Sequence, residues 1–220
     1  MMPRVLVTGA NRGIGLELAR QLKEAGWDVI AACRHRSPEI EGIGVRIEEL
    51  DVSDDASVRA LGERLRGIEL DLLINNAGIL HDDGLAPLEV DKIRRQFEVN
   101  ALGPLKVTAA LLDNLKAGSK VVIVSSRMGS IGDNTSGGSY GYRMSKAAVN
   151  AAGVSLAHDL RERGIIVLIV HPGYVRTELT GGKGLIDPPE SARGILALVE
   201  RAGPEDSGTF RHVNGDRLPW

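Results

Sequence analysis

Six short apolar runs, each rich in Val, Ile and Leu, alternate along the chain with amphipathic stretches. The runs lie at 4–9, 28–33, 45–52, 70–78, 120–126 and 165–173. Continuous apolar runs of this length are typical of strands buried on both faces, which are parallel. Helical spacing with charged outer faces lies between them, at 15–26, 54–67 and about 87 to 117. This alternation predicts an α/β fold: a doubly wound, Rossmann-like parallel sheet with helices on both faces.

The length and charge of the chain restrict its organisation and its partners. A chain of 220 residues suits one well-filled core, so we expect a single domain over residues 1–220. The formal net charge of -2 gives no general attraction to nucleic acid or to an anionic membrane. No apolar run approaches the roughly 20 residues of a membrane span, and the chain starts in a strand-like segment rather than a signal peptide. The single cysteine, Cys33, cannot form an internal disulfide, so we expect a cytoplasmic protein.

A glycine-rich segment, TGANRGIG, directly follows the first apolar run. Glycines in this position let the backbone turn tightly and approach a pyrophosphate at the N-terminus of the next helix, where free N–H groups favour an anion. The spacing of Gly9, Gly13 and Gly15 departs from the common G-x-G-x-x-G pattern. The segment therefore predicts a dinucleotide-binding turn of a variant type.

The residues at the end of the second apolar run indicate whether the chain prefers NAD or NADP(H). A carboxylate there would accept a hydrogen bond from the ribose 2′-hydroxyl of NAD, but this chain has Cys33 followed by Arg34. Arg34 offers a planar fork suited to phosphate, and Arg12 can approach from the other side. Two solvated surface arginines are the alternative. We interpret the pair as a site for the 2′-phosphate of NADP(H).

The segment YGYRMSK holds two tyrosines and a lysine. Tyr142 and Lys146 are four residues apart and share one face of a helix, whereas Tyr140 lies six residues before the lysine and faces elsewhere. We therefore expect Tyr140 to have a packing or substrate-lining role. Y-x-x-x-K occurs by chance in many helices, so its meaning depends on the rest of the chain.

Four further segments complete a recognisable order: NNAG at 75–78, Asn100 in the long helical span, Ser125-Ser126 at the end of a strand, and HPGYVRT at 171–177. With T-G-x-x-x-G-I-G and Y-x-x-x-K, this order resembles the short-chain dehydrogenase/reductase family. The segments SSRMGSI and GGSYGYRMSKAA are most similar to sequences of the branch that contains small carbonyl reductases, sniffer-like proteins and C-factor. The matching motifs extend from residue 8 to 177.

The resemblance implies an NADPH-dependent oxidoreductase that reduces a ketone or aldehyde to an alcohol by hydride transfer. It implies that Tyr142 is the proton donor and that Lys146 binds the hydroxyls of the nicotinamide ribose. Ser126 would form a hydrogen bond with the substrate oxygen, and Asn100 would order a water that relays protons to Lys146. The implied cofactor-binding residues are Gly9, Asn11, Arg12, Gly13, Ile14, Gly15, Arg34, Asp51, Val52, Asn76, Ala77, Gly78, Tyr142, Lys146, Pro172, Gly173, Val175 and Thr177.

Elementary electrostatics adds an expectation for the tyrosine. A free tyrosine has a pKa of about 10, so activity near neutrality would need a decrease of up to about 3 units. A lysine ammonium at about 4 Å supplies about 4 kcal/mol at an effective dielectric near 20. We therefore expect Lys146 to lower the pKa of Tyr142.

The position of the active-site serine is ambiguous by spacing. The family's serine usually lies thirteen residues before its tyrosine, whereas Ser126 lies sixteen before Tyr142 and Ser130 lies twelve before it. Ser126 directly ends an apolar run, and strand ends of an open α/β sheet face the ligand crevice. We therefore predict Ser126, with three extra residues in the loop 132–138.

Two other kinds of protein share some of these motifs. A nucleotide-binding signalling or scaffold protein of the C-factor type has no chemical need for Asn100, Ser126, Tyr142 and Lys146 together. A nucleotide-sugar epimerase would need a substantial C-terminal substrate domain, and only about 40 residues follow Thr177. The histidines show no metal-ligand spacing, so we expect no metal. The carbonyl substrate is open, and family members form monomers, dimers and tetramers, which leaves a homodimer or homotetramer open.

Overall fold

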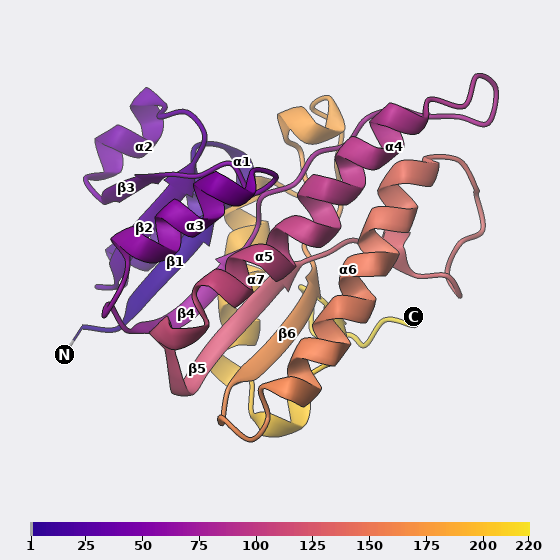
Figure 1. The fold of residues 1–220 in the computed structure, drawn as a ribbon. Helices are drawn as coiled ribbons and strands as arrows, with labels where there is room; N and C mark the ends of the chain where they lie inside the picture. The colour runs from indigo at the N-terminus through magenta and orange to yellow at the C-terminus, as the bar shows by residue number, and fades with distance from the viewer. Residues whose placement is uncertain (1) are drawn as a thin grey trace.

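A computed structural model describes residues 2–220, and its centre is a parallel sheet of seven strands (Figure 1). The order across the sheet is β3-β2-β1-β4-β5-β6-β7. The strands are β1 (Arg4–Thr8), β2 (Asp28–Cys33), β3 (Arg46–Glu49), β4 (Leu70–Asn75), β5 (Leu115–Val124), β6 (Ile166–His171) and β7 (Phe210–His212). The order reverses between β1 and β4, and open α/β sheets bind ligands at such a switch point, beyond the carboxyl ends of the strands. The expected doubly wound parallel sheet is confirmed.

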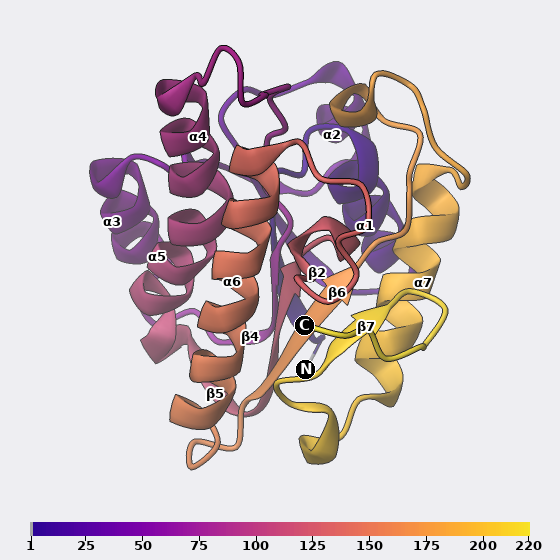
Figure 2. The ribbon, with the colours of Figure 1, turned by 90° about the vertical axis from the view of Figure 1, so that its right-hand side faces the viewer.

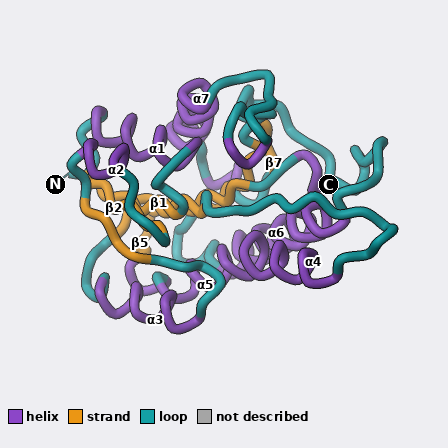
Figure 3. Tube along the Cα trace, turned by 90° about the horizontal axis from the view of Figure 1, so that it is seen from above, coloured by secondary structure: helices purple, strands orange, loops and turns teal. Residues whose placement is uncertain are grey.

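Helices cover both faces of the sheet, and the two layers are seen end-on in Figure 2 and from above in Figure 3. One layer holds α3 (Asp55–Arg64), α5 (Gly103–Ala110) and α6 (Tyr140–Asp159), with α4 (Val90–Phe97) packed along α6. The other holds α1 (Gly13–Glu24), α7 (Pro188–Arg201) and the short α2 (Pro38–Ile43). Short helical turns at 112–114, 127–129, 178–180 and 204–206 complete the helical segments.

Each layer has its own apolar core, because successive strand residues point to opposite faces. Leu6, Leu73 and Ile123 pack under α3, α5 and α6, whereas Val5, Leu72 and Val122 pack under α1 and α7. All six are at most 1 % exposed. Burial on both faces explains why these strands appear in the sequence as continuous apolar runs.

The long helical span is divided into three parts. α4 leads into a π-helix (Glu98–Leu102), which α5 then continues. Gly103 begins α5 against Val52, and a Cβ on this glycine would lie 2.9 Å from a methyl carbon of Val52. The π-helix, a conformation often found at functional sites, places Asn100 in the interior with 0 % exposure.

Several boundaries differ from the sequence prediction. α2 and β7 were not predicted, because six and three residues are too few for a periodic pattern. Ser37 caps α2 by accepting a hydrogen bond from the backbone N–H of Ile40, at 3.3 Å. The helix α6 ends at Asp159, and the charged run 160–164 that follows it forms a turn.

Candidate active site

The glycine-rich turn fits tightly against the segment that follows β4. Gly9 has φ +67°, and a Cβ there would lie 2.8 Å from the Cα of Ala77. A Cβ on Gly15 would lie 2.2 Å from the carbonyl oxygen of Gly9. The Asn76 side chain donates to the carbonyl oxygen of Thr8 at 2.9 Å, and the Thr8 hydroxyl accepts from the backbone N–H groups of Asn76 and Ala77, both at 3.0 Å. Only glycine fits these two positions, so the backbone is open to a ligand on its other side.

A cleft of about 480 Å³ lies beyond the carboxyl ends of the central strands. Fifteen of the expected residues line it: Gly9, Asn11, Arg12, Gly13, Ile14, Arg34, Asp51, Val52, Asn76, Ala77, Gly78, Tyr142, Lys146, Pro172 and Thr177. Gly15, Asn100, Ser126, Gly173 and Val175 are not among its lining residues. Gly15 lies behind the Gly9 backbone, and Val175 is buried and bridged to Ile186. Gly15 and Val175 therefore support the cleft from behind its walls.

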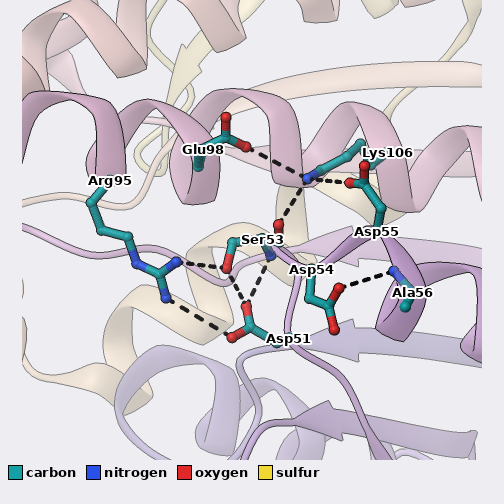
Figure 4. Close-up of polar contacts among 8 residues, drawn as sticks. All are labelled: Asp51, Ser53, Asp54, Asp55, Ala56, Arg95, Glu98 and Lys106. Atoms are coloured by element: carbon teal, nitrogen blue, oxygen red, sulfur yellow. Dashed lines mark hydrogen bonds and ion pairs between the residues drawn. The ribbon is translucent and has the colours of Figure 1, made fainter. Parts of the chain in front are cut away.

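The wall around Asp51 is held by a polar network (Figure 4). One carboxylate oxygen of Asp51 accepts from the backbone N–H and the hydroxyl of Ser53, at 2.9 and 2.6 Å. Arg95 of α4 donates to the Ser53 hydroxyl at 3.0 Å, and Lys106 of α5 donates to the Ser53 carbonyl at 3.1 Å. Burial raises the pKa of Asp51, but these hydrogen bonds and the nearby arginines outweigh it, and the net shift is downward. Asp51 lies after the end of β3, not within it.

Tyr142 and Lys146 lie together on α6, as their spacing predicted. Tyr142 is 8 % exposed and Lys146 is 4 % exposed, whereas Tyr140 is 38 % exposed. The Lys146 ammonium lies 5.7 Å from the centre of the Tyr142 ring and donates to the carbonyl oxygen of Val124 at 2.9 Å. The tyrosine and lysine therefore face the same end of the cleft, and Tyr140 does not share their environment.

The expected decrease in the tyrosine pKa does not appear. Burial raises the pKa of Tyr142 to about 12, and a hydrogen bond with Ser126 lowers it only in part. Burial also lowers the pKa of Lys146 to about 8. The expectation failed because it treated the pair as partly solvated, whereas desolvation disfavours the charged form of both groups. The tyrosine is thus a protonated phenol at neutral pH.

Ser126 and Ser130 have different surroundings. The Ser126 hydroxyl is near enough to Tyr142 to lower the pKa of the phenol, and it accepts from the backbone N–H of Met128 at 3.1 Å. Ser130 is 1 % exposed, and its hydroxyl accepts from the backbone N–H of Asp133 at 3.1 Å, within its own loop. Ser126 is therefore the serine that affects the tyrosine, and the Ser130 hydroxyl is hydrogen-bonded within its own loop.

The Asn100 amide is engaged on both of its ends. Its oxygen accepts from the backbone N–H of Ile79 at 2.8 Å, and its nitrogen donates to the Ile79 carbonyl at 2.8 Å and to the Ser145 hydroxyl at 3.1 Å. A Cβ on Gly78 would lie 3.3 Å from the Asn100 oxygen and 3.8 Å from the Lys146 nitrogen. Asn100 thus fixes the segment after NNAG beside Lys146, without a direct bond to the lysine.

A buried carboxylate that the sequence analysis missed fixes the start of the tyrosine helix. Asp83 is 6 % exposed, and one of its oxygens accepts from the backbone N–H of Gly141 at 3.0 Å and from the Gln96 side chain at 2.8 Å. A negative group is favourable at a helix N-terminus. Its sequence surroundings, HDDG, resemble a solvated loop, and the partners are too far along the chain for a motif to reveal them.

Residues 174–187, which we call the strap, cover the glycine turn. The strap closes on itself through a bridge between Val175 and Ile186 and through Arg176, which donates to Asp187 at 2.6 Å. Thr177 begins a helical turn, and its methyl carbon lies 3.4 Å from the position of a Cβ on Gly13. The next residue, Glu178, is ion-paired with Arg12. The strap therefore contacts the glycine turn across the cleft.

The cleft and the groups at its two ends indicate the kind of chemistry that the site can support. A switch-point cleft with a glycine turn at one end and a buried phenol and amine at the other is the arrangement of an oxidoreductase that works with a nicotinamide dinucleotide. The chain belongs to the short-chain dehydrogenase family, whose family model, described as short chain dehydrogenase, matches residues 3–184. The resemblance read from the motifs is confirmed.

Individual relatives agree with this assignment. The chain is 44% identical over 226 residues, covering 100% of both chains, to 1-hydroxy-2-glutathionyl-2-methyl-3-butene dehydrogenase of a Rhodococcus species. It is 43% identical to C-signal of Myxococcus xanthus over 157 residues, which cover 69% of this chain and 93% of that protein.

Solved structures with similar folds belong to the same branch. Carbonyl reductase from chicken fatty liver, determined with NADPH bound, has a TM-score of 0.90 and 31% identity over 100% of this chain and 99% of the other. Carbonyl reductase Sniffer of D. melanogaster has a TM-score of 0.93 and 29% identity over 100% of both chains. The small carbonyl-reductase branch expected from the sequence is therefore confirmed.

Residues 2–220 contain neither a helix suited to span a membrane nor a cluster of metal-ligating side chains. Over residues 2–220, no helix has both the length and the apolar character that crossing a membrane requires. Over the same residues, no group of three or more His, Cys, Asp or Glu side chains is arranged to hold a metal ion.

Proposed function

We propose that this protein is an NADP(H)-dependent oxidoreductase that reduces a ketone or aldehyde to an alcohol, with Tyr142 as the proton donor. The observation that carries the proposal is the buried pair of Tyr142 and Lys146, which faces the same cleft as the glycine turn, with Ser126 near the tyrosine. A protein that only binds a nucleotide would have no need to bury a phenol and an amine there.

The cleft fits a dinucleotide at both of its ends. The glycine turn exposes backbone N–H groups at the start of α1, which favour a pyrophosphate, and Lys146 and Thr177 line the end where the nicotinamide would be held. The cofactor supplies a hydride to the carbonyl carbon when it is bound. Asp51 and Val52 line the cleft where the adenine would be held.

The chain's own residues supply the proton chemistry. Tyr142 is protonated at neutral pH and can donate its proton to the carbonyl oxygen, and Ser126 can donate a hydrogen bond to the same oxygen. Lys146, with a pKa of about 8, exchanges protons near neutrality and favours the tyrosine anion when it is charged. Asn100 holds the Ile79 backbone beside this lysine, where the proposed water would be ordered.

NADPH is the proposed cofactor because of the side chains at the end of β2. Cys33 and Arg34 line the cleft there, and over residues 2–220 the Arg34 side chain has no hydrogen bond or ion pair. Arg34 is therefore available to a 2′-phosphate, and no carboxylate at Cys33 repels it. The expected preference is at least about 1–3 kcal/mol, which is about 5- to 150-fold in kcat/KM. Cys33→Asp combined with Arg34→Ala should invert it, and equal efficiency of the unmodified protein with both cofactors would contradict the assignment.

The name of the relative with the highest identity described above gives one candidate class of substrate. That protein is a dehydrogenase of an alcohol with a glutathionyl substituent next to the hydroxyl-bearing carbon. We include an alcohol of this kind among the candidate substrates, to be assayed by NADP reduction. Aldehydes, ketones, diketones and quinones are to be assayed by NADPH oxidation.

The second candidate is a binding protein with a signalling or scaffold role, supported by the 43% identity to C-signal. The two candidates differ in turnover. The test is NADPH oxidation by the unmodified protein and by Tyr142→Phe, each at matched cofactor occupancy. Carbonyl-dependent oxidation that Tyr142→Phe removes supports the enzyme, whereas NADPH binding with no turnover across the panel supports the binding protein.

A further inference from the structure

We propose that Glu178 limits the affinity for NADPH, and so narrows the preference over NADH, because its carboxylate competes with the 2′-phosphate for Arg12. This inference rests on the proposed function, since it concerns the same cofactor cleft. It assigns a specificity role to a strap residue that makes no expected contact of its own with the phosphate.

The first observation is that the two arginines of the expected phosphate site, Arg12 and Arg34, differ in whether they have an ion-pair partner. Arg12 is ion-paired with Glu178, whereas Arg34 is without a hydrogen bond or ion pair in the described part of the chain. Both arginines line the same cleft. One of the two must therefore exchange a carboxylate for a phosphate when NADPH binds.

The second observation is that the strap holds Glu178 in place. The Thr180 hydroxyl accepts from the backbone N–H of Thr177 at 3.1 Å and donates to the Val175 carbonyl at 2.8 Å, and the Thr180 backbone N–H donates to the Thr177 carbonyl at 3.1 Å. Gly182 donates its backbone N–H to the Thr177 carbonyl at 2.8 Å. The backbone of Glu178 is thus fixed opposite the glycine turn, and the competition depends on its side chain.

The third observation concerns charge. Asp51 and Glu178 are the two carboxylates among the residues that line the cleft. Asp51 is hydrogen-bonded to Ser53 and is near both Arg34 and Arg95, so more than one arginine compensates its charge. Glu178 has Arg12 as its ion-pair partner. A 2′-phosphate that takes over Arg12 leaves this carboxylate uncompensated.

The size of the effect follows from exposure. The Arg12 and Glu178 side chains are 60% and 73% exposed, and ion pairs this exposed change an equilibrium by a factor of about two to five. A phosphate dianion binds an arginine more strongly than one carboxylate does, so the exchange favours NADPH. Glu178 therefore reduces NADPH affinity without preventing binding.

The experiment measures dissociation constants for NADPH and NADH by titration calorimetry in four proteins: unmodified, Glu178→Gln, Arg12→Ala and the double variant. Glu178→Gln should bind NADPH about two- to fivefold more tightly, with a change of less than about 1.5-fold for NADH. In the Arg12→Ala background, Glu178→Gln should give no such gain for NADPH. The gain should shrink at high salt, because exposed charges are screened.

The control is Glu200→Gln, which removes an exposed carboxylate of α7 outside the cleft and should leave both constants unchanged. Thermal melting of each variant reports folding. The inference is overturned if Glu178→Gln leaves NADPH affinity unchanged or raises the affinity for both cofactors equally. It is also overturned if the gain in NADPH affinity persists in the Arg12→Ala background. Failure of the unmodified protein to bind NADPH would instead overturn the proposed function together with this inference.

Discussion

Replacing Lys146 with methionine should stabilise the cofactor-free protein while abolishing carbonyl reduction. Lys146 is 4 % exposed, and burial lowers its pKa from 10.5 to about 8. The folded state therefore disfavours the charged form that the unfolded chain carries at neutral pH. Methionine has a similar length, fits an apolar environment, and removes this charge.

The magnitude follows from the two pKa values of the lysine. A decrease of that size corresponds to about 3 kcal/mol of lost stability at pH 7. The substitution also removes the 2.9 Å hydrogen bond to the Val124 carbonyl, which offsets about 1–2 kcal/mol. We expect Lys146→Met to raise the free energy of unfolding by about 1–2 kcal/mol at pH 7.

The pH dependence gives the sharper test. Because the folded pKa is below the unfolded pKa, the lysine's penalty is complete below about pH 8 and disappears as the pH rises toward 10.5. Between pH 7 and pH 9 the unmodified protein should gain about 1.4 kcal/mol relative to Lys146→Met. Urea unfolding of both proteins at the two pH values measures this difference, because the other titrating groups are shared. A gap between the two proteins that stays constant with pH would refute the reasoning.

Three further predictions concern catalysis and cofactor binding. Tyr142→Phe should lower kcat for carbonyl reduction by about 10²–10⁴ with an unchanged NADPH dissociation constant, whereas Tyr140→Phe should stay within about threefold in steady-state assays. Ser126→Ala should lower kcat by about 10²–10³ and Ser130→Ala by less, and the opposite ranking would move the substrate-binding hydroxyl to Ser130. Gly15→Ala should abolish NADPH binding, because its Cβ would lie 2.2 Å from the carbonyl oxygen of Gly9, and calorimetric titration that finds normal binding would contradict this.

The parts of the fold that the sequence predicted are those that repeat a simple physical rule. Strands β1, β2 and β6 are buried on both faces, so an unbroken apolar run identifies each one. The helix α7 also begins with a local signal, because two prolines start it and glycine-rich sequence precedes it. β7 has three residues and depends on its pairing with β6, which no local pattern encodes.

In the candidate site, too, local rules predicted some contacts, whereas contacts between residues distant in sequence were not predicted. Tyr142 and Lys146 are neighbours because of helical spacing, and that rule is local. Contacts between Arg12 and Glu178 join residues 166 positions apart, and those between Asp83 and Gly141 join residues 58 apart. The direction of the Tyr142 pKa shift was wrong for a related reason, since it depends on how deeply the whole fold buries the phenol.

The loop before the tyrosine helix has a consequence for how such a reductase could acquire new substrates. Arg143, next to Tyr142, donates to the Ser136 hydroxyl at 2.8 Å and to the Gly138 carbonyl at 3.1 Å. These bonds clamp the last part of the loop onto the first turn of α6, while Ile131 at the other end of the loop is 80 % exposed. The exposed Ile131 side chain can therefore be exchanged in a directed-evolution library without moving Tyr142, provided that Arg143 and its partners Ser136 and Gly138 are kept.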